Sequence, residues 1–306
     1  MRYVIETCHL AKHYQGFPAV RDVSLRISKG EIYGFIGLNG AGKTTTIRML
    51  LGMIRPTKGA CYLNGKKVGR HNQAIWHRVG YMIETPHAYP ELTVQENLEM
   101  MRKLRFVTHP HAVTQAMDWL RLTRFADKKA KHLSLGNAQR LGIAKALLHQ
   151  PDILILDEPV NGLDPAGIVE IRDLLQDLAY NEGVTILISS HLLDEVTRIA
   201  TKIGIIHEGT LIQEVDPVRL NQWLKPRLLM DSHDNQRAAA KLSQAGYTIR
   251  FNQQGFVEIY SEEAICHPDK IARFLVYEGL PPTRLSVEKE DLEAYFLSMI
   301  ERKGEI

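Results

Sequence analysis

A glycine-rich segment next to a lysine and two threonines is the first feature of the sequence that could carry chemistry. Residues 37–44 read Gly-Leu-Asn-Gly-Ala-Gly-Lys-Thr, after the apolar run 32–37 and before a helical run. Glycines let backbone N–H groups turn inward around phosphate oxygens, and the N-terminus of the following helix adds a favourable partial charge. A chance glycine-rich turn is the alternative, but this context favours a phosphate-binding loop, with a lysine that can reach the β- and γ-phosphates. The residues predicted to bind phosphate are Asn39, Gly40, Ala41, Gly42, Lys43, Thr44 and Thr45.

Two consecutive carboxylates, Asp157 and Glu158, follow the apolar run 153–156. Ligands of open α/β sheets bind at the carboxyl ends of such strands. Alone, the pair is more simply a solvated strand end, but beside a phosphate-binding loop the catalytic interpretation is favoured. Asp157 and the Thr44 hydroxyl would then hold Mg²⁺, and Glu158 would be the general base that polarises the attacking water.

The elements that must position these residues are of two kinds. Val23, Leu25 and Ile27 alternate with polar residues, and Asn64-Gly65 marks a tight hairpin, so the first sixty or so residues should contain an antiparallel part. Near-continuous apolar runs are instead typical of parallel strands buried on both faces. Such runs occupy residues 32–37, 153–156, 185–189 and 203–206. Residues from about 90 to 132 have helical spacing and predict a helical insert, so we place a helical subdomain at about 85–140.

After about Val215 the pattern changes to β-α-β-β-α-β-α. The expected strands lie near 228–230, 248–251, 256–260 and 284–287, the helices at 235–244 and 268–277, and a final helix starts at about Asp291. This order predicts a small α+β accessory domain with a ferredoxin-like arrangement. The predicted domains are 1–216, an α/β nucleotide-binding domain, and 217–306.

Composition excludes several classes of protein. The formal charge is +3, from 38 basic and 35 acidic residues, which is too balanced to indicate a nucleic-acid partner. Cys8, Cys61 and Cys266 are far apart and form no CxxC pair, so neither a disulfide framework nor a zinc site is predicted. The apolar runs are strand-sized, and we expect no membrane-spanning segment.

A third motif points to a family. Residues 133–140 read Leu-Ser-Leu-Gly-Asn-Ala-Gln-Arg, which resembles the signature motif of ABC ATPases, usually LSGGQ. Residues 161–165 resemble the D-loop of that family, which contains Asp164, and His191 resembles its switch histidine. Tyr14 stands where the family places an aromatic that stacks on adenine. The resemblance covers residues 3–215 and implies a P-loop ABC ATPase that uses ATP and Mg²⁺, with Glu158 and His191 catalytic.

The chain departs from the usual pattern at two places. Glu84 replaces the glutamine that commonly ligates the metal, so the metal ligands implied are Thr44, Glu84 and Asp157; a solvent-facing or membrane-subunit-facing Glu84 is the alternative. The signature residues implied to act on the ATP of a partner subunit are Ser134, Leu135, Gly136, Asn137 and Gln139. Both departures resemble ABC exporters of the bacitracin and lantibiotic type, which implies export of an antibiotic or peptide.

The resemblance also implies partners. Two copies would form a head-to-tail homodimer, in which a helix beginning near Ala138 points its N-terminus at the γ-phosphate across the interface. Residues 85–97 would contact separate integral membrane permease subunits and hold the protein at the cytoplasmic side of the membrane. A soluble ABC ATPase of translation or DNA repair is the alternative, but this chain has one P-loop and no sustained heptads. Lys43, Asp157, Glu158 and His191 argue against an inactive cassette.

Overall fold

The computed structural model describes residues 3–69, 72–84, 86–223, 226–252 and 254–289, the side chains of 221–223 excepted. The chain divides into two compact units, Met1–Pro217 and Val218–Ile306, and each has its own sheet and its own apolar core. No helix in the described ranges has the length and apolar character needed to cross a membrane.

One mixed sheet forms the first unit. Its strands are β1 (Ile5–Tyr14), β2 (Phe17–Val23), β3 (Arg26–Ile27), β4 (Ile32–Ile36), β5 (Lys58–Leu63), β6 (Lys66–Lys67), β7 (Val79–Met82), β8 (Ile153–Asp157), β9 (Thr185–Ser190), β10 (Lys202–His207) and β11 (Thr210–Val215). Their order across the sheet is β6-β5-β1-β2-β11-β10-β4-β9-β8-β7, with β3 paired to β1.

The predicted antiparallel part is confirmed. β1 pairs antiparallel with both β2 and β5, and β5 turns back into β6 at Asn64 and Gly65. These two residues have φ angles of 51° and 72°, the left-handed conformation that a tight hairpin turn requires.

The predicted parallel strands are confirmed as well. β10, β4, β9, β8 and β7 pair in parallel in that order, and every residue of β4 and β8 is buried. Along β8, Leu154 and Leu156 pack into one apolar cluster and Ile153 and Ile155 into another, because successive side chains point to opposite faces. Burial on both faces explains why these runs are apolar throughout instead of alternating.

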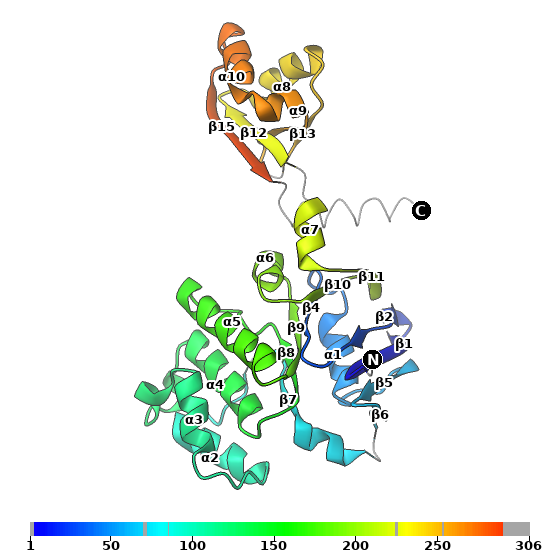
Figure 1. Cartoon of the computed structure of the whole chain (residues 1–306), viewed down its shortest axis with the longest axis vertical. Helices are drawn as coiled ribbons and strands as arrows, with labels where there is room; N and C mark the ends of the chain where they lie inside the picture. Colours follow the sequence, from blue (N-terminus) through cyan, green and yellow to red (C-terminus); the bar gives the residue numbers. More distant parts are fainter. Residues whose placement is uncertain (1–2, 70–71, 85, 224–225, 253, 290–306) are drawn as a thin grey trace. The chain divides into compact units, whose positions relative to one another are not determined.

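Helices cover the sheet. They are α1 (Lys43–Leu50), α2 (Val94–Leu104), α3 (Ala112–Trp119), α4 (Leu135–Leu147), α5 (Pro165–Tyr180) and α6 (Leu193–Thr197), and 3₁₀ turns occupy Gln73–Arg78, Thr123–Phe125 and Ala130–His132. Figure 1 shows α2, α3, α4 and α5 together on one side, away from the antiparallel strands β1, β2 and β5.

The helical insert predicted after residue 90 is confirmed by α2 and α3. Thr93 and Glu96 form a capping box that starts α2. The start of α4 was predicted too late: the helix begins at Leu135, not near Ala138, because the Ser134 hydroxyl caps it by accepting from the N–H of Asn137 at 3.4 Å.

The second unit is a four-stranded antiparallel sheet with helices. Helix α7 (Pro217–Trp223) spans the division, and β12 (Pro226–Ser232), α8 (Asn235–Gln244), β13 (Ile249–Phe251), β14 (Val257–Ile259), α9 (Glu262–Cys266), α10 (Pro268–Tyr277) and β15 (Pro282–Lys289) follow. The sheet order is β13-β14-β12-β15. The helices predicted at 235–244 and 268–277 are confirmed, α9 was not predicted, and the helix expected from about Asp291 lies outside the described residues.

Candidate active site

The glycine-rich loop joins the end of β4 to the start of α1. Gly40 and Gly42 have φ angles of 82° and 104°, and a Cβ atom on Gly42 would lie 2.7 Å from the carbonyl oxygen of Ala19. Only glycine fits there without strain. Lys43, the first residue of α1, is 6% exposed, and its Nζ donates to the carbonyl oxygens of Gly37 and Leu38 at 2.6 and 3.3 Å. The loop therefore holds a buried cation next to the N-terminus of a helix.

The first predicted carboxylate meets this loop. Asp157 ends β8 and is 1% exposed. Its Oδ2 accepts from Thr44 Oγ1 at 2.8 Å, and its Oδ1 accepts a short hydrogen bond from the Ser189 hydroxyl on the neighbouring strand β9. The structure thus brings together Thr44 and Asp157, which the sequence analysis assigned to one magnesium site.

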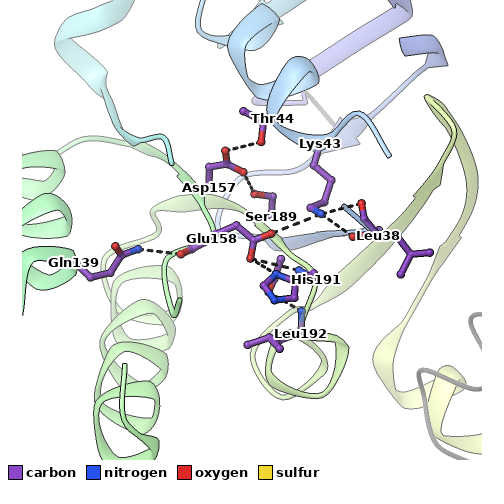
Figure 2. A network of polar contacts seen from close by, with 11 residues as sticks. Leu38, Lys43, Thr44, Gln139, Asp157, Glu158, Ser189, His191 and Leu192 are labelled. Carbon is purple, nitrogen blue, oxygen red and sulfur yellow. Dashed lines mark hydrogen bonds and ion pairs between the residues drawn. The ribbon is translucent and has the colours of Figure 1, made fainter. Parts of the chain in front are cut away.

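The second carboxylate lies between a lysine and a histidine (Figure 2). Glu158 Oε1 is 3.6 Å from Lys43 Nζ, and Glu158 Oε2 is 2.9 Å from His191 Nδ1. The φ angle of Glu158 is 52°, and its backbone N–H donates to the carbonyl oxygen of Ser189 at 3.0 Å. Left-handed backbone at a residue other than glycine costs energy and is concentrated at functional sites, where the surrounding structure holds it.

Lys43, Thr44, Asp157 and Glu158 line one cavity of about 380 Å³. Its described lining is Ala19, Leu38, Asn39, Gly40, Ala41, Gly42, Lys43, Thr44, Thr45, Glu84, Pro86, Leu135, Gln139, Asp157, Glu158 and Asn161. All seven residues predicted to bind phosphate are in this set.

The lining fits a nucleoside triphosphate with Mg²⁺. A buried ammonium group at the N-terminus of a helix suits phosphate oxygens, and a hydroxyl with a carboxylate suits a hard cation. Among the described residues, no group of three or more His, Cys, Asp or Glu could hold a metal by itself. Mg²⁺ is usually held by one or two protein groups together with water and substrate phosphates, and Thr44 and Asp157 are groups of the right chemistry.

The signature residues lie at the edge of this cavity and beside it. Leu135 and Gln139 line the cavity, and Gln139 Nε2 donates to the Glu158 carbonyl oxygen at 2.9 Å. Ser134, Gly136 and Asn137 line a neighbouring hollow of about 860 Å³ that also contains Asp164. Asp164 caps α5 by accepting from the Gly167 N–H at 3.0 Å.

Glu84 and Tyr14 make contacts that the sequence analysis did not predict. Glu84 lines the cavity, but its Oε1 pairs with Arg48 Nη2 at 2.6 Å. Tyr14, 44% exposed at the end of β1, is not among the described residues that line the cavity, and Lys12 Nζ lies 4.9 Å from its ring centroid. Glu84 thus lines the same cavity as Thr44 and Asp157, but its side chain is paired with Arg48.

Sequence reasoning missed Ser189 and Arg48. The sequence did carry a signal for Ser189: it is a hydroxyl residue near the end of the apolar strand β9. In the sheet this residue lies opposite Asp157 of the neighbouring strand β8. Arg48 had no such signal, because it looks like an ordinary basic residue in the last turn of α1.

Comparison with known proteins agrees with this geometry. The family description "ABC transporter" matches residues 20–161. The chain is 40% identical to the bacitracin transport ATP-binding protein BcrA of Enterococcus faecalis, over 98% of this chain and 97% of that protein. It is 37% identical to BcrA of Bacillus licheniformis over 98% of both chains. A dimeric bacterial ABC transporter cassette superposes with a TM-score of 0.64 at 26% identity, covering 70% of this chain and 98% of the other.

A phosphate-binding loop, two strand-end carboxylates and two signature residues line one cavity, and a histidine contacts the second carboxylate. Relatives that match nearly the whole chain are named as ATP-binding proteins of transport. The chain therefore belongs to the ABC transporter family, as an ATP-binding subunit.

Proposed function

We propose that the protein hydrolyses ATP and drives substrate export through separate membrane-spanning subunits. The observation that carries the proposal is Glu158, held between Lys43 and His191 at the wall of the phosphate cavity. A carboxylate in this position can accept a proton from water beside a bound phosphate.

Each residue has a part in the reaction. Lys43 exchanges its contacts with Glu158 and the two loop carbonyls for phosphate oxygens. His191 orients the Glu158 carboxylate through Nδ1, and Thr44 and Asp157 hold Mg²⁺, with Glu84 as a candidate further ligand. When bound, Mg²⁺ neutralises charge on the phosphates. Glu158 then takes the proton of the attacking water, and Tyr14 stacks on the adenine.

We infer a head-to-tail homodimer as the active state. Leu135 is 58% exposed in the signature turn, and Ser134 and Asp164 line the hollow beside it, so these groups are available to a second copy. In that arrangement residues 134–137 of one subunit face the nucleotide of the other. The dimeric cassette that superposes on this chain supports the proposal.

The cargo proposed is an antibiotic or peptide of the bacitracin type. The support is that two relatives named for bacitracin transport match nearly the whole chain. Permease subunits would bind residues 85–97 and hold the protein at the cytoplasmic side of the membrane. Co-purification with the membrane fraction separates this function from that of a soluble ABC ATPase.

We further infer that residues 217–306 form a ferredoxin-like accessory domain, separate from a nucleotide-binding domain of residues 1–216. The support is the strand order β13-β14-β12-β15, with α8 between β12 and β13 and α9 and α10 between β14 and β15.

Glu158→Gln tests the proposed function. The amide cannot accept the proton of water, so the variant should bind ATP, lose turnover and elute as a dimer in size-exclusion chromatography with ATP and Mg²⁺. Glu182→Gln, an exposed position on the loop after α5, is the control and should behave as the wild type. A Glu158→Gln protein that stays monomeric and hydrolyses ATP would remove Glu158 from the role of base.

A further inference from the structure

The signature turn and the D-loop contact each other directly within one subunit. A Cβ atom on Gly162 would lie 2.3 Å from Leu135 Cδ2 and 2.6 Å from Leu135 Cγ. The Leu135 side chain therefore packs against the backbone of Gly162, whose φ angle is 75°. A Cβ atom on Gly136 would similarly lie 3.2 Å from Leu163 Cδ2. The usual signature of the family has glycine at position 135, which could not make this contact.

Charged groups join the same two segments one turn further along. Arg140 of α4 pairs through Nη2 with Glu170 Oε2 of α5 at 2.6 Å, and the Arg140 side chain is only 13% exposed. Arg121, which precedes the signature turn in sequence, forms a second, short ion pair with Glu170. A Cβ atom on Gly167 would lie 3.2 Å from Arg140 Nη2, so the Arg140 side chain reaches the first turn of α5.

These contacts limit relative movement between two segments, the start of α4 and the loop that ends at Asp164, the N-cap of α5. Packed interfaces of this kind move as one body and do not deform gradually. Leu135 is the first residue of α4, and its side chain lies against Gly162, two residues before Asp164.

We propose that Leu135 is a positioning residue that holds the D-loop, residues 161–165, against the signature turn. When the signature of one subunit binds nucleotide, Leu135 then fixes the position of Asp164 in that same subunit. The proposal rests on the proposed ATPase dimer, and it makes Leu135 a determinant of cooperativity between the two ATP sites. Leu135 acts through Gly162 and takes no part in the chemical step.

The first test needs no nucleotide. In the full-length, nucleotide-free protein, Leu135→Ala should speed amide hydrogen exchange about tenfold in peptides covering residues 160–167, because their packing partner is lost. Alanine keeps the helix start, and Leu135→Met should restore slow exchange. Leu104→Ala, at a position 62% exposed on α2, is the matched control and should leave these peptides unchanged. Unchanged exchange in Leu135→Ala would overturn the link.

The second test measures ATPase rate against ATP concentration. Leu135→Ala should lower kcat about fivefold and bring the Hill coefficient toward that of independent sites. A Leu135→Ala protein with wild-type kcat and Hill coefficient would also overturn the proposal. Wild-type protein that hydrolyses no ATP would instead contradict the proposed function, while the exchange result would still report on the contact.

A double-mutant cycle separates positioning from general damage. Gly162→Ala should lower kcat because its Cβ collides with Leu135, and adding Leu135→Ala should recover part of that loss. Recovery supports direct packing between the two residues, whereas multiplicative losses would contradict it.

Discussion

Thr44 at the start of α1 donates a hydrogen bond of 2.8 Å to Asp157 at the end of β8, which joins the phosphate loop to the strand-end carboxylates. Ser189 holds the other oxygen of the same carboxylate. The two hydroxyls therefore fix the orientation of Asp157 from opposite oxygens.

Ser189→Ala should weaken metal use without preventing folding. Losing one hydrogen bond frees the carboxylate to rotate, and groups that orient metal ligands typically matter at the level of about tenfold in metal affinity. The half-saturating Mg²⁺ concentration for ATPase activity should rise by that order. Ser190→Ala, equally buried on β9 but bonded to the Leu192 N–H, should leave it unchanged. Equal Mg²⁺ curves for Ser189→Ala and wild type would exclude this role.

Lys43→Ala should remove most nucleotide affinity. The buried ammonium group donates to two loop carbonyl oxygens and lies near the Glu158 carboxylate. Without it, the negative charge of a bound phosphate has no cationic partner. Calorimetry with ADP should show binding weakened by about a hundredfold or more. Lys29→Ala, away from the loop, is the control. Equal affinity in Lys43→Ala would disprove the assignment of the phosphate loop.

The sequence predicted the local parts of this site well and their mutual contacts poorly. The loop, Asp157 and Glu158 were found because strand, turn and helix signals are adjacent in the chain. The contacts of Glu158 with Lys43 and His191 join residues far apart in sequence, and periodicity within one element does not report which side chains of different elements meet. Glu84 shows the same limit, since its partner Arg48 lies 36 residues earlier in the chain, on α1. The five-residue helix α9 is too short to display a helical period.

His149 should make the protein sensitive to mild acid. Burial, together with the nearby positive charge of Arg105, lowers the pKa of His149 from 6.5 to about 4, and its Nε2 contacts the Val79 carbonyl oxygen at 3.0 Å. His149 takes up a proton near pH 6.5 in the unfolded chain but only near pH 4 in the folded chain. The free energy of unfolding is therefore highest above pH 6.5 and decreases as the pH falls from 6.5 to about 4.

In urea unfolding between pH 7 and pH 4, the wild type should therefore lose about 1–3 kcal/mol relative to His149→Gln. Glutamine can still donate to the Val79 carbonyl but does not titrate. His233→Gln, at an exposed position in the second unit, is the control and should follow the wild type. A constant difference between wild type and His149→Gln across this range would show that His149 does not titrate with a lowered pKa.

Glu84 is the predicted metal ligand at which this chain differs from the glutamine usual in the family. Its carboxylate lines the cavity yet pairs with Arg48, so serving the metal requires Glu84 to leave the guanidinium group. If it does so, Glu84→Gln should keep activity but need more Mg²⁺, because a neutral amide is a weaker ligand for a hard cation. Arg48→Met should shift the requirement in the opposite direction, since the carboxylate is then no longer held by a competing cation. ATPase rates measured against Mg²⁺ concentration for the wild type and both variants separate the two roles. Opposite shifts place Glu84 at the metal, and three superimposable curves would confine it to its ion pair with Arg48.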